Sequence, residues 1–84
     1  MKLVLVEWLD SHSGRGWQDF ERLERAAKPL YCRSVGWVIR ENKDCTVLVP
    51  HIAGEKNGEA VLQGCGDLTI PTASIVKTTI LRSR

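Results

Sequence analysis

The sequence predicts a single, mainly β domain spanning 1–84, a small antiparallel barrel that carries one helix. Short apolar and β-branched runs, separated by polar turns, predict the strands. Only 17–28 shows the periodicity of a helix. In the tail, a strand ends at Ile70, Pro71 withdraws a backbone donor, and a β-branched run resumes at Ile75. A strand, one turn around a proline and a final strand are typical of how small barrels close.

The first part of the chain contains one strand, one loop and the helix. Residues 2–8 are apolar on both faces, which predicts a strand covered on both sides. Turn-forming residues predict a loop over 10–16. The helix at 17–28 has acid-before-base pairs four residues apart and ends before Pro29. We expect its apolar stripe to pack against the sheet; the stripe comprises Trp17, Phe20, Leu23 and Ala27.

The rest of the chain alternates strands with turns. Gly36, inside an alternating apolar segment, indicates a bend or a close backbone approach. Polar residues predict a hairpin turn at 41–44, and glycines predict a mobile loop at 51–60. The predicted strands are 31–40, 45–50, a short segment at 61–63, the strand that ends at Ile70, and 75–82.

The order of these elements favours a particular architecture. Five short antiparallel strands with one helical insertion fit a barrel of the Src-homology-3-like kind. The helix would occupy the long first loop of such a barrel and plug one open end. The alternative is an α+β sheet with the helix packed across one face.

Several motifs occur in a recognisable order outside 51–60. They are VEWLDS at 6–11, Trp17, SVGWV at 34–38, VLVP at 47–50 and IPTASI at 70–75. Together they resemble a group of small uncharacterised proteins of bacteriophages, prophages and other mobile elements. The resemblance implies a phage or mobile-element context and a small barrel fold, and it implies no catalytic residues.

Composition excludes some functional classes. Hydrophobic residues make up 43% and charged residues 26%, as in an ordinary folded domain. The net charge of +2 does not indicate a dedicated nucleic-acid binder. Apolar residues follow Lys2 as in a signal start, but Glu7 interrupts them early. We therefore expect no membrane segment and a cytoplasmic location.

The three cysteines suggest no metal or disulfide site. Their odd number argues against a disulfide framework, so we expect buried, reduced thiols. With His51 they lack the close ligand pairs of a structural zinc site. A cysteine nucleophile would need His12 or His51 as its base, and Cys65, between two glycines, is the most exposed candidate. The cysteines are Cys32, Cys45 and Cys65.

Hydrolase-type residues occur together at 10–13, as Asp10, Ser11, His12 and Ser13. Proximity in sequence does not make a catalytic triad, and such residues after a strand more commonly cap a turn. The glycines at 14 and 16 lack the full spacing of a phosphate-binding loop. We therefore expect no catalytic, cofactor-binding or metal-binding residues.

Tryptophans are frequent, with three in 84 residues. The usual interpretation places all of them in the core, Trp17 through the helix stripe. The alternative leaves Trp8 or Trp37 partly exposed as an anchor for a protein partner. The candidate partner-binding residues are Trp8, Asp10 and Trp37.

The tail is basic, because no acidic residue follows Asp67. Lys77, Arg82 and Arg84 are the candidate nucleic-acid contacts. A solvated edge strand protected by charge explains the same residues without a function.

The preferred hypothesis is a non-enzymatic accessory protein of a phage or mobile element that acts through protein contacts. We also expect a homo-oligomer whose contact includes Trp8 or Trp37. The first alternative is a small nucleic-acid-binding module that uses the basic tail. The second is a small enzyme or metal protein.

Overall fold

The computed structural model describes residues 1–54 and 62–82. The chain is mainly β, and five strands form one antiparallel sheet in the order β6-β3-β2-β1-β7. Two short strands, β4 and β5, form a separate ribbon. The elements are β1 (Leu3–Asp10), α1 (Phe20–Arg25), β2 (Leu30–Glu41), β3 (Cys45–Val49), β4 (His51–Ala53), β5 (Gln63–Cys65), β6 (Leu68–Pro71), the 3-10 helix η1 (Thr72–Ser74) and β7 (Ile75–Ile80).

The large sheet is bent but does not close into a barrel, which corrects the predicted closed form. Bulges at Ile39 in β2 and Val76 in β7 shift the pairing register, and such bulges bend a sheet. Within the described residues, β6 and β7 are edge strands of the sheet and do not pair with each other. The chain instead passes from one edge to the other through η1, directly after Pro71, which has no N–H to donate.

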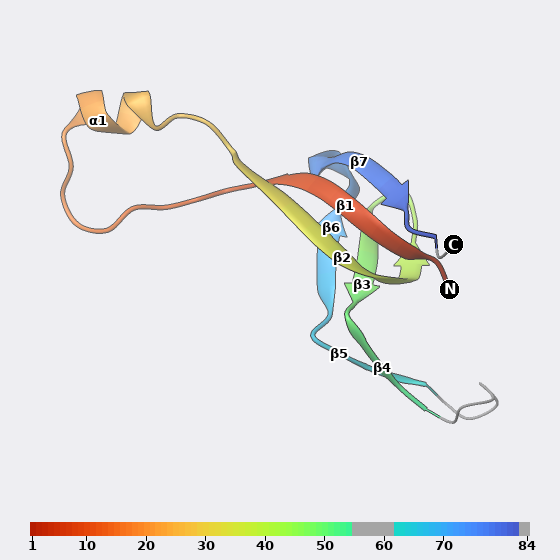
Figure 1. Ribbon diagram of the computed structural model, residues 1–84. Helices are drawn as coiled ribbons and strands as arrows, with labels where there is room; N and C mark the ends of the chain where they lie inside the picture. Colours follow the sequence, from red (N-terminus) through yellow and green to blue (C-terminus); the bar gives the residue numbers. More distant parts are fainter. Residues whose placement is uncertain (55–61, 83–84) are drawn as a thin grey trace.

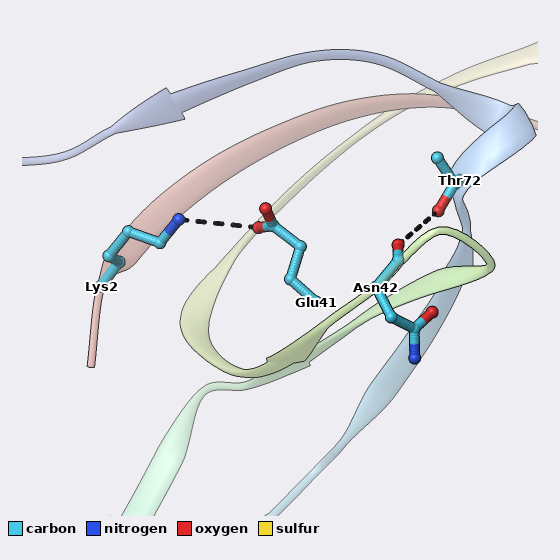
Figure 2. Close-up of polar contacts among 4 residues, drawn as sticks. All are labelled: Lys2, Glu41, Asn42 and Thr72. Atoms are coloured by element: carbon cyan, nitrogen blue, oxygen red, sulfur yellow. Dashed lines mark hydrogen bonds and ion pairs between the residues drawn. The ribbon is translucent and has the colours of Figure 1, made fainter.

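Contacts with the β2–β3 turn hold η1 in place between the two edges of the bent sheet. Figure 2 shows the Thr72 hydroxyl donating to the carbonyl of Asn42 at 3.3 Å, and Lys2 Nζ 3.7 Å from a Glu41 carboxylate oxygen. The N–H of Thr72 also donates to the carbonyl of Asp44 at 2.9 Å. The two Thr72 hydrogen bonds attach η1 to the β2–β3 turn, whereas the Lys2–Glu41 pair joins the start of β1 to the end of β2.

The core lies on the concave face of the sheet and is small. Val4 and Val6 of β1 are fully buried there, together with Ile70 of β6. Three further side chains, half-buried, pack against this cluster: Trp8, Leu68 and Ile75. The remaining core members are Val38 and Leu48. So small a cluster leaves much of the chain's apolar surface outside the core.

Gly36 lies where two strands approach closely, as its sequence context predicts. It is buried, and a Cβ atom there would lie 2.9 Å from the carbonyl oxygen of Val49 and 3.2 Å from Cβ of Leu48. A contact of 2.9 Å is shorter than normal van der Waals packing allows. Only glycine fits this position without a backbone shift.

The helix corrects both sequence-based architectures, because it neither plugs a barrel nor crosses a sheet face. It covers only Phe20–Arg25 instead of 17–28, and none of its residues is buried. Figure 1 shows α1 at the end of a long excursion between β1 and β2, well away from the sheet.

The pairing of β1 with β2 explains this excursion. The two strands remain paired out to Asp10 and Leu30, whereas β7 pairs with β1 only as far as Trp8 and β3 pairs with β2 only from Trp37. The last part of the β1–β2 ladder is therefore a free two-stranded ribbon. It carries residues 11–29 away from the core before the helix begins.

The other predicted strands are confirmed with small shifts. The segments at 2–8, 31–40 and 45–50 correspond to β1, β2 and β3, and the tail contains β6 and β7 around Pro71. The strand predicted at 61–63 appears as β5, two residues later, because it pairs with β4. The loop predicted at 51–60 begins as β4, and its residues 55–60 lie outside the described parts.

Candidate protein-interaction site

The most exposed apolar side chains lie on the excursion between β1 and β2, residues 11–29, which we call the arm. A contact across its base closes it: the His12 ring Nε2 donates to the carbonyl of Lys28 at 2.7 Å. Near the tip, the Gln18 side-chain amide donates to the carbonyl of Arg15 at 3.3 Å. The arm is thus a loop with its own internal contacts, supported by the β1–β2 ribbon.

Local hydrogen bonds form the helix at the tip of the arm. Asp19 precedes it, and its carbonyl accepts the N–H groups of Arg22 and Leu23 at 3.1 and 3.2 Å. Glu21 and Arg25, one turn apart, approach within 3.4 Å, and both side chains are largely exposed. Exposed pairs of this kind stabilise a helix only slightly. Because none of its residues is buried, the helix gains no core packing from the sheet.

Three apolar side chains on the arm are wholly or partly exposed. Trp17 is fully exposed, at 105% of its reference area, Phe20 is 82% exposed and Leu23 is 47% exposed. Their spacing of three residues places Phe20 and Leu23 on the same side of the helix. We call these three residues the arm stripe. Large exposed apolar groups of this kind commonly mark interaction sites.

Charges on the arm are balanced. Four basic side chains, Arg15, Arg22, Arg25 and Lys28, accompany three acidic ones, Asp19, Glu21 and Glu24. A surface of mixed sign does not select a strongly charged partner. The arm stripe, not the charge, is therefore the distinguishing chemistry of this segment.

The convex face of the sheet, opposite the core, is also apolar. The register places Leu3 opposite Trp37 and Leu5 opposite Val35 on this face. Val35 is half-exposed, and Trp37 is half-buried. Ile39, further along β2, is also half-exposed.

A hollow of about 410 Å³ lies where β2 and β3 meet the β4–β5 ribbon. We call it the hollow. Apolar side chains form most of its wall, and Asp67 is its one charged lining residue. The apolar lining residues are Met1, Ile39, Val47, Val49, Ile52 and Leu62, and Gln63 and Gly64 complete the wall.

The predicted partner-binding residues are not brought together. Trp8 is half-buried against the core, and its ring N–H donates to the Ser34 hydroxyl at 3.0 Å. Trp37 lies on the other face, because it pairs with Leu3. Asp10 accepts a hydrogen bond from the N–H of Ser11 at 2.8 Å, as a turn cap does.

The expected place of Trp17 in the core is wrong. The spacing of Trp17, Phe20 and Leu23 predicts an apolar cover for the stripe, but it does not predict which surface provides that cover. The excursion could have been recognised from the sequence, because strand-forming residues continue through Leu9 before it and begin again at Leu30 after it. Two such segments in register extend a hairpin beyond its neighbouring strands.

The cysteines are free thiols, and their predicted burial is wrong. Cys32 and Cys45 are half-buried and Cys65 is exposed. The register of the β4–β5 ribbon places His51 directly opposite Cys65. Both residues line a second, smaller pocket of about 180 Å³, which is distinct from the hollow. This pair supplies at most two ligands of a tetrahedral zinc set. Among the described residues, no group of three or more potential metal ligands occurs.

The hydrolase-type segment at 10–13 functions as a turn and as the base of the arm. Its histidine bonds to a backbone carbonyl across the arm, and its aspartate bonds to a backbone N–H. Neither hydrogen bond joins one of the candidate catalytic side chains to another. The geometry therefore serves local structure.

An acidic side chain of β1 lies opposite the basic tail. Lys77 pairs in register with Glu7, whose carboxylate also lies 3.7 Å from Arg33 Nε. The Tyr31 hydroxyl donates to the same carboxylate at 2.9 Å, and this hydrogen bond is the main cause that raises the pKa of Tyr31. Arg82 is exposed beyond β7, and Arg84 lies outside the described residues.

No protein-family model matches the chain, and no curated protein or solved structure matches it. Among the described residues, no helix has the length and apolar character needed to cross a membrane.

Proposed function

We propose that the chain is a non-enzymatic accessory protein of a phage or mobile element, and that it acts in the cytoplasm through protein contacts made by the arm. The observation that carries the proposal is the full exposure of Trp17, with Phe20 beside it, on a segment that packs against no part of the sheet. A few side chains provide most of the binding energy at protein interfaces, and tryptophan is among the residues most often found in that role.

The construction of the arm suits recognition. The β1–β2 ribbon supports it, and the His12 contact to Lys28 holds its two branches together, so a partner would order few new residues on binding. A short helix that presents an apolar side also fits the common mode in which a helix docks in a groove.

The body of the molecule supports a Src-homology-3-like arrangement within this proposal. The observations that support it are the strand order β6-β3-β2-β1-β7 and the 3-10 turn between the last two strands of the chain. In this arrangement the sheet is the scaffold, and the long first loop is the recognition element.

Capture from extract of the native host cell tests the proposal. We expect the tagged wild-type chain to retain a protein in near-stoichiometric amount, and the double variant Trp17→Ala, Phe20→Ala to lose it. Val76→Ala serves as the matched control, because Val76 is equally apolar and 55% exposed but lies on β7. Equal retention by the wild type and the arm variant would contradict the proposal.

A further inference from the structure

We propose that the partner of the arm is a second copy of this chain, and that the arm stripe of each copy docks in the hollow of the other. This inference rests on the proposed function and identifies its partner. The hollow and the arm stripe are complementary in chemistry, because aliphatic side chains line the first and aromatic side chains dominate the second. At about 410 Å³, the hollow is within the range of sites that bind apolar groups.

The accessible surface of the chain supports a second copy. The chain exposes 7217 Å². A compact monomer of 9.4 kDa would expose about 5,000 Å². If two copies each buried half of the difference, the contact would remove about 2,200 Å² in total, which is within the range of obligate homodimers.

Geometry prevents the arm from reaching the hollow of its own chain. The arm leaves the sheet after Asp10 of β1, whereas Met1, at the opposite end of the same strand, lines the hollow. The eight residues of β1 alone separate the two ends by roughly 25 Å. Figure 1 shows the arm and the β4–β5 ribbon extending in opposite directions from the sheet.

A two-fold axis satisfies both contacts at once. The molecule is elongated, 57 Å long and 27 by 25 Å across. If two copies lie side by side and antiparallel, each arm is placed at the hollow end of the other copy. Such a pair is closed, because the same two surfaces are used by both copies. The balanced charge of the arm and the net charge of only +2 oppose this pairing weakly.

Light scattering at a series of concentrations tests the inference. We expect a dimer mass for the wild type and a monomer mass for Trp17→Ala, Phe20→Ala, with the dimer dissociation constant raised at least about 100-fold. Ile39→Lys, which places a charge in the hollow at a half-exposed bulge, should also give monomers. Val76→Lys is the control, since Val76 is a half-exposed bulge residue outside the hollow, and it should remain dimeric.

Mixing the two monomeric variants gives a sharper result. A heterodimer of the arm variant with Ile39→Lys retains one intact contact, namely the normal arm of the second chain in the normal hollow of the first. We therefore expect the mixture to form dimers that neither variant forms alone. Circular dichroism of each variant verifies that its sheet is intact before mixing.

Several results would overturn the inference. A wild-type monomer at tens of micromolar would do so, as would an arm variant that stays dimeric or a mixture that stays monomeric beside a dimeric wild type. The proposed function is tested by a separate result. If the wild type is monomeric but captures a different protein through Trp17, only the self-association is wrong.

Discussion

Gly36 shows how much the sheet depends on one missing side chain. In Gly36→Ala the new Cβ would lie 2.9 Å from the Val49 carbonyl oxygen, a backbone atom that cannot move without moving β3. We expect the unfolding free energy to fall by about 1–3 kcal/mol in urea denaturation, as for other overpacked sites.

Gly14→Ala is the matched control for this substitution. Its new Cβ would meet only the end of the flexible Gln18 side chain on the arm. We expect a change within about 0.5 kcal/mol, as for ordinary surface sites. Equal losses in the two variants would contradict the close approach at Gly36.

The pKa of Tyr31 reports the hydrogen bond between its hydroxyl and the Glu7 carboxylate. Its pKa lies above the ordinary value of 10.0 because its hydroxyl donates to Glu7, with desolvation and the charge of Glu7 as smaller causes and Arg33 acting in the opposite direction. A raised folded-state pKa contributes stability below pH 10.0, and this contribution is lost as the pH rises through the folded-state pKa.

Ultraviolet titration of the phenolate measures this directly, because Tyr31 is the single tyrosine of the chain. We expect Glu7→Ala to lower the pKa of Tyr31 toward its ordinary value. In Lys77→Ala the hydrogen bond remains, so the pKa of Tyr31 should stay raised. If Glu7→Ala leaves this pKa unchanged, the hydrogen bond is not its cause.

At the scale of elements, the arm and the sheet should respond differently to the loss of a large apolar side chain. Ile70 is fully buried and Phe20 is 82% exposed. We expect Ile70→Ala to cost about 2–5 kcal/mol of unfolding free energy. Phe20→Ala should change it by less than about 0.5 kcal/mol.

Both substitutions are best measured in the monomeric Ile39→Lys background, where dimer formation does not add to stability. Urea denaturation followed by circular dichroism gives the two values. A loss of several kcal/mol in Phe20→Ala would mean that the arm folds back on its own sheet.

The sequence predicts the strands well because their signals are local. Alternation in β2, the proline at 71 and the β-branched run of β7 each act within a few residues. The arm and the hollow depend on pairing at a distance. The helix lies far from the core because β1 and β2 remain paired beyond the ends of their neighbouring strands. One wall of the hollow is formed by β4 and β5, whose paired residues are ten or more positions apart in the sequence.

The amphipathic stripe of the helix has the same sequence pattern whether its cover is in the same chain or in another. The predicted packing of the stripe against the chain's own sheet is wrong, because the structure leaves these side chains exposed. At the scale of the whole molecule, the core is small, and the radius of gyration of 17.0 Å exceeds the roughly 12 Å of a compact chain of this length.

The central claim is that the arm docks on a second copy of the chain. Measuring the solvent exposure of Trp17 at different protein concentrations tests it most directly. Labelling with fluorotryptophan gives one fluorine NMR resonance for each of the three tryptophans. Trp17→Phe identifies the resonance of Trp17, and the heavy-water isotope shift of that resonance measures its exposure to solvent. Trp8 and Trp37, both half-buried in the single chain, are internal references.

The account predicts that Trp17 shows the full isotope shift in dilute monomer and loses it as the concentration rises and dimers form. A Trp17 shielded from solvent at every dilution, with a monomer mass, would place the arm against its own sheet. A Trp17 exposed at every concentration would leave the arm without a partner copy. Either of these last two results would contradict the account.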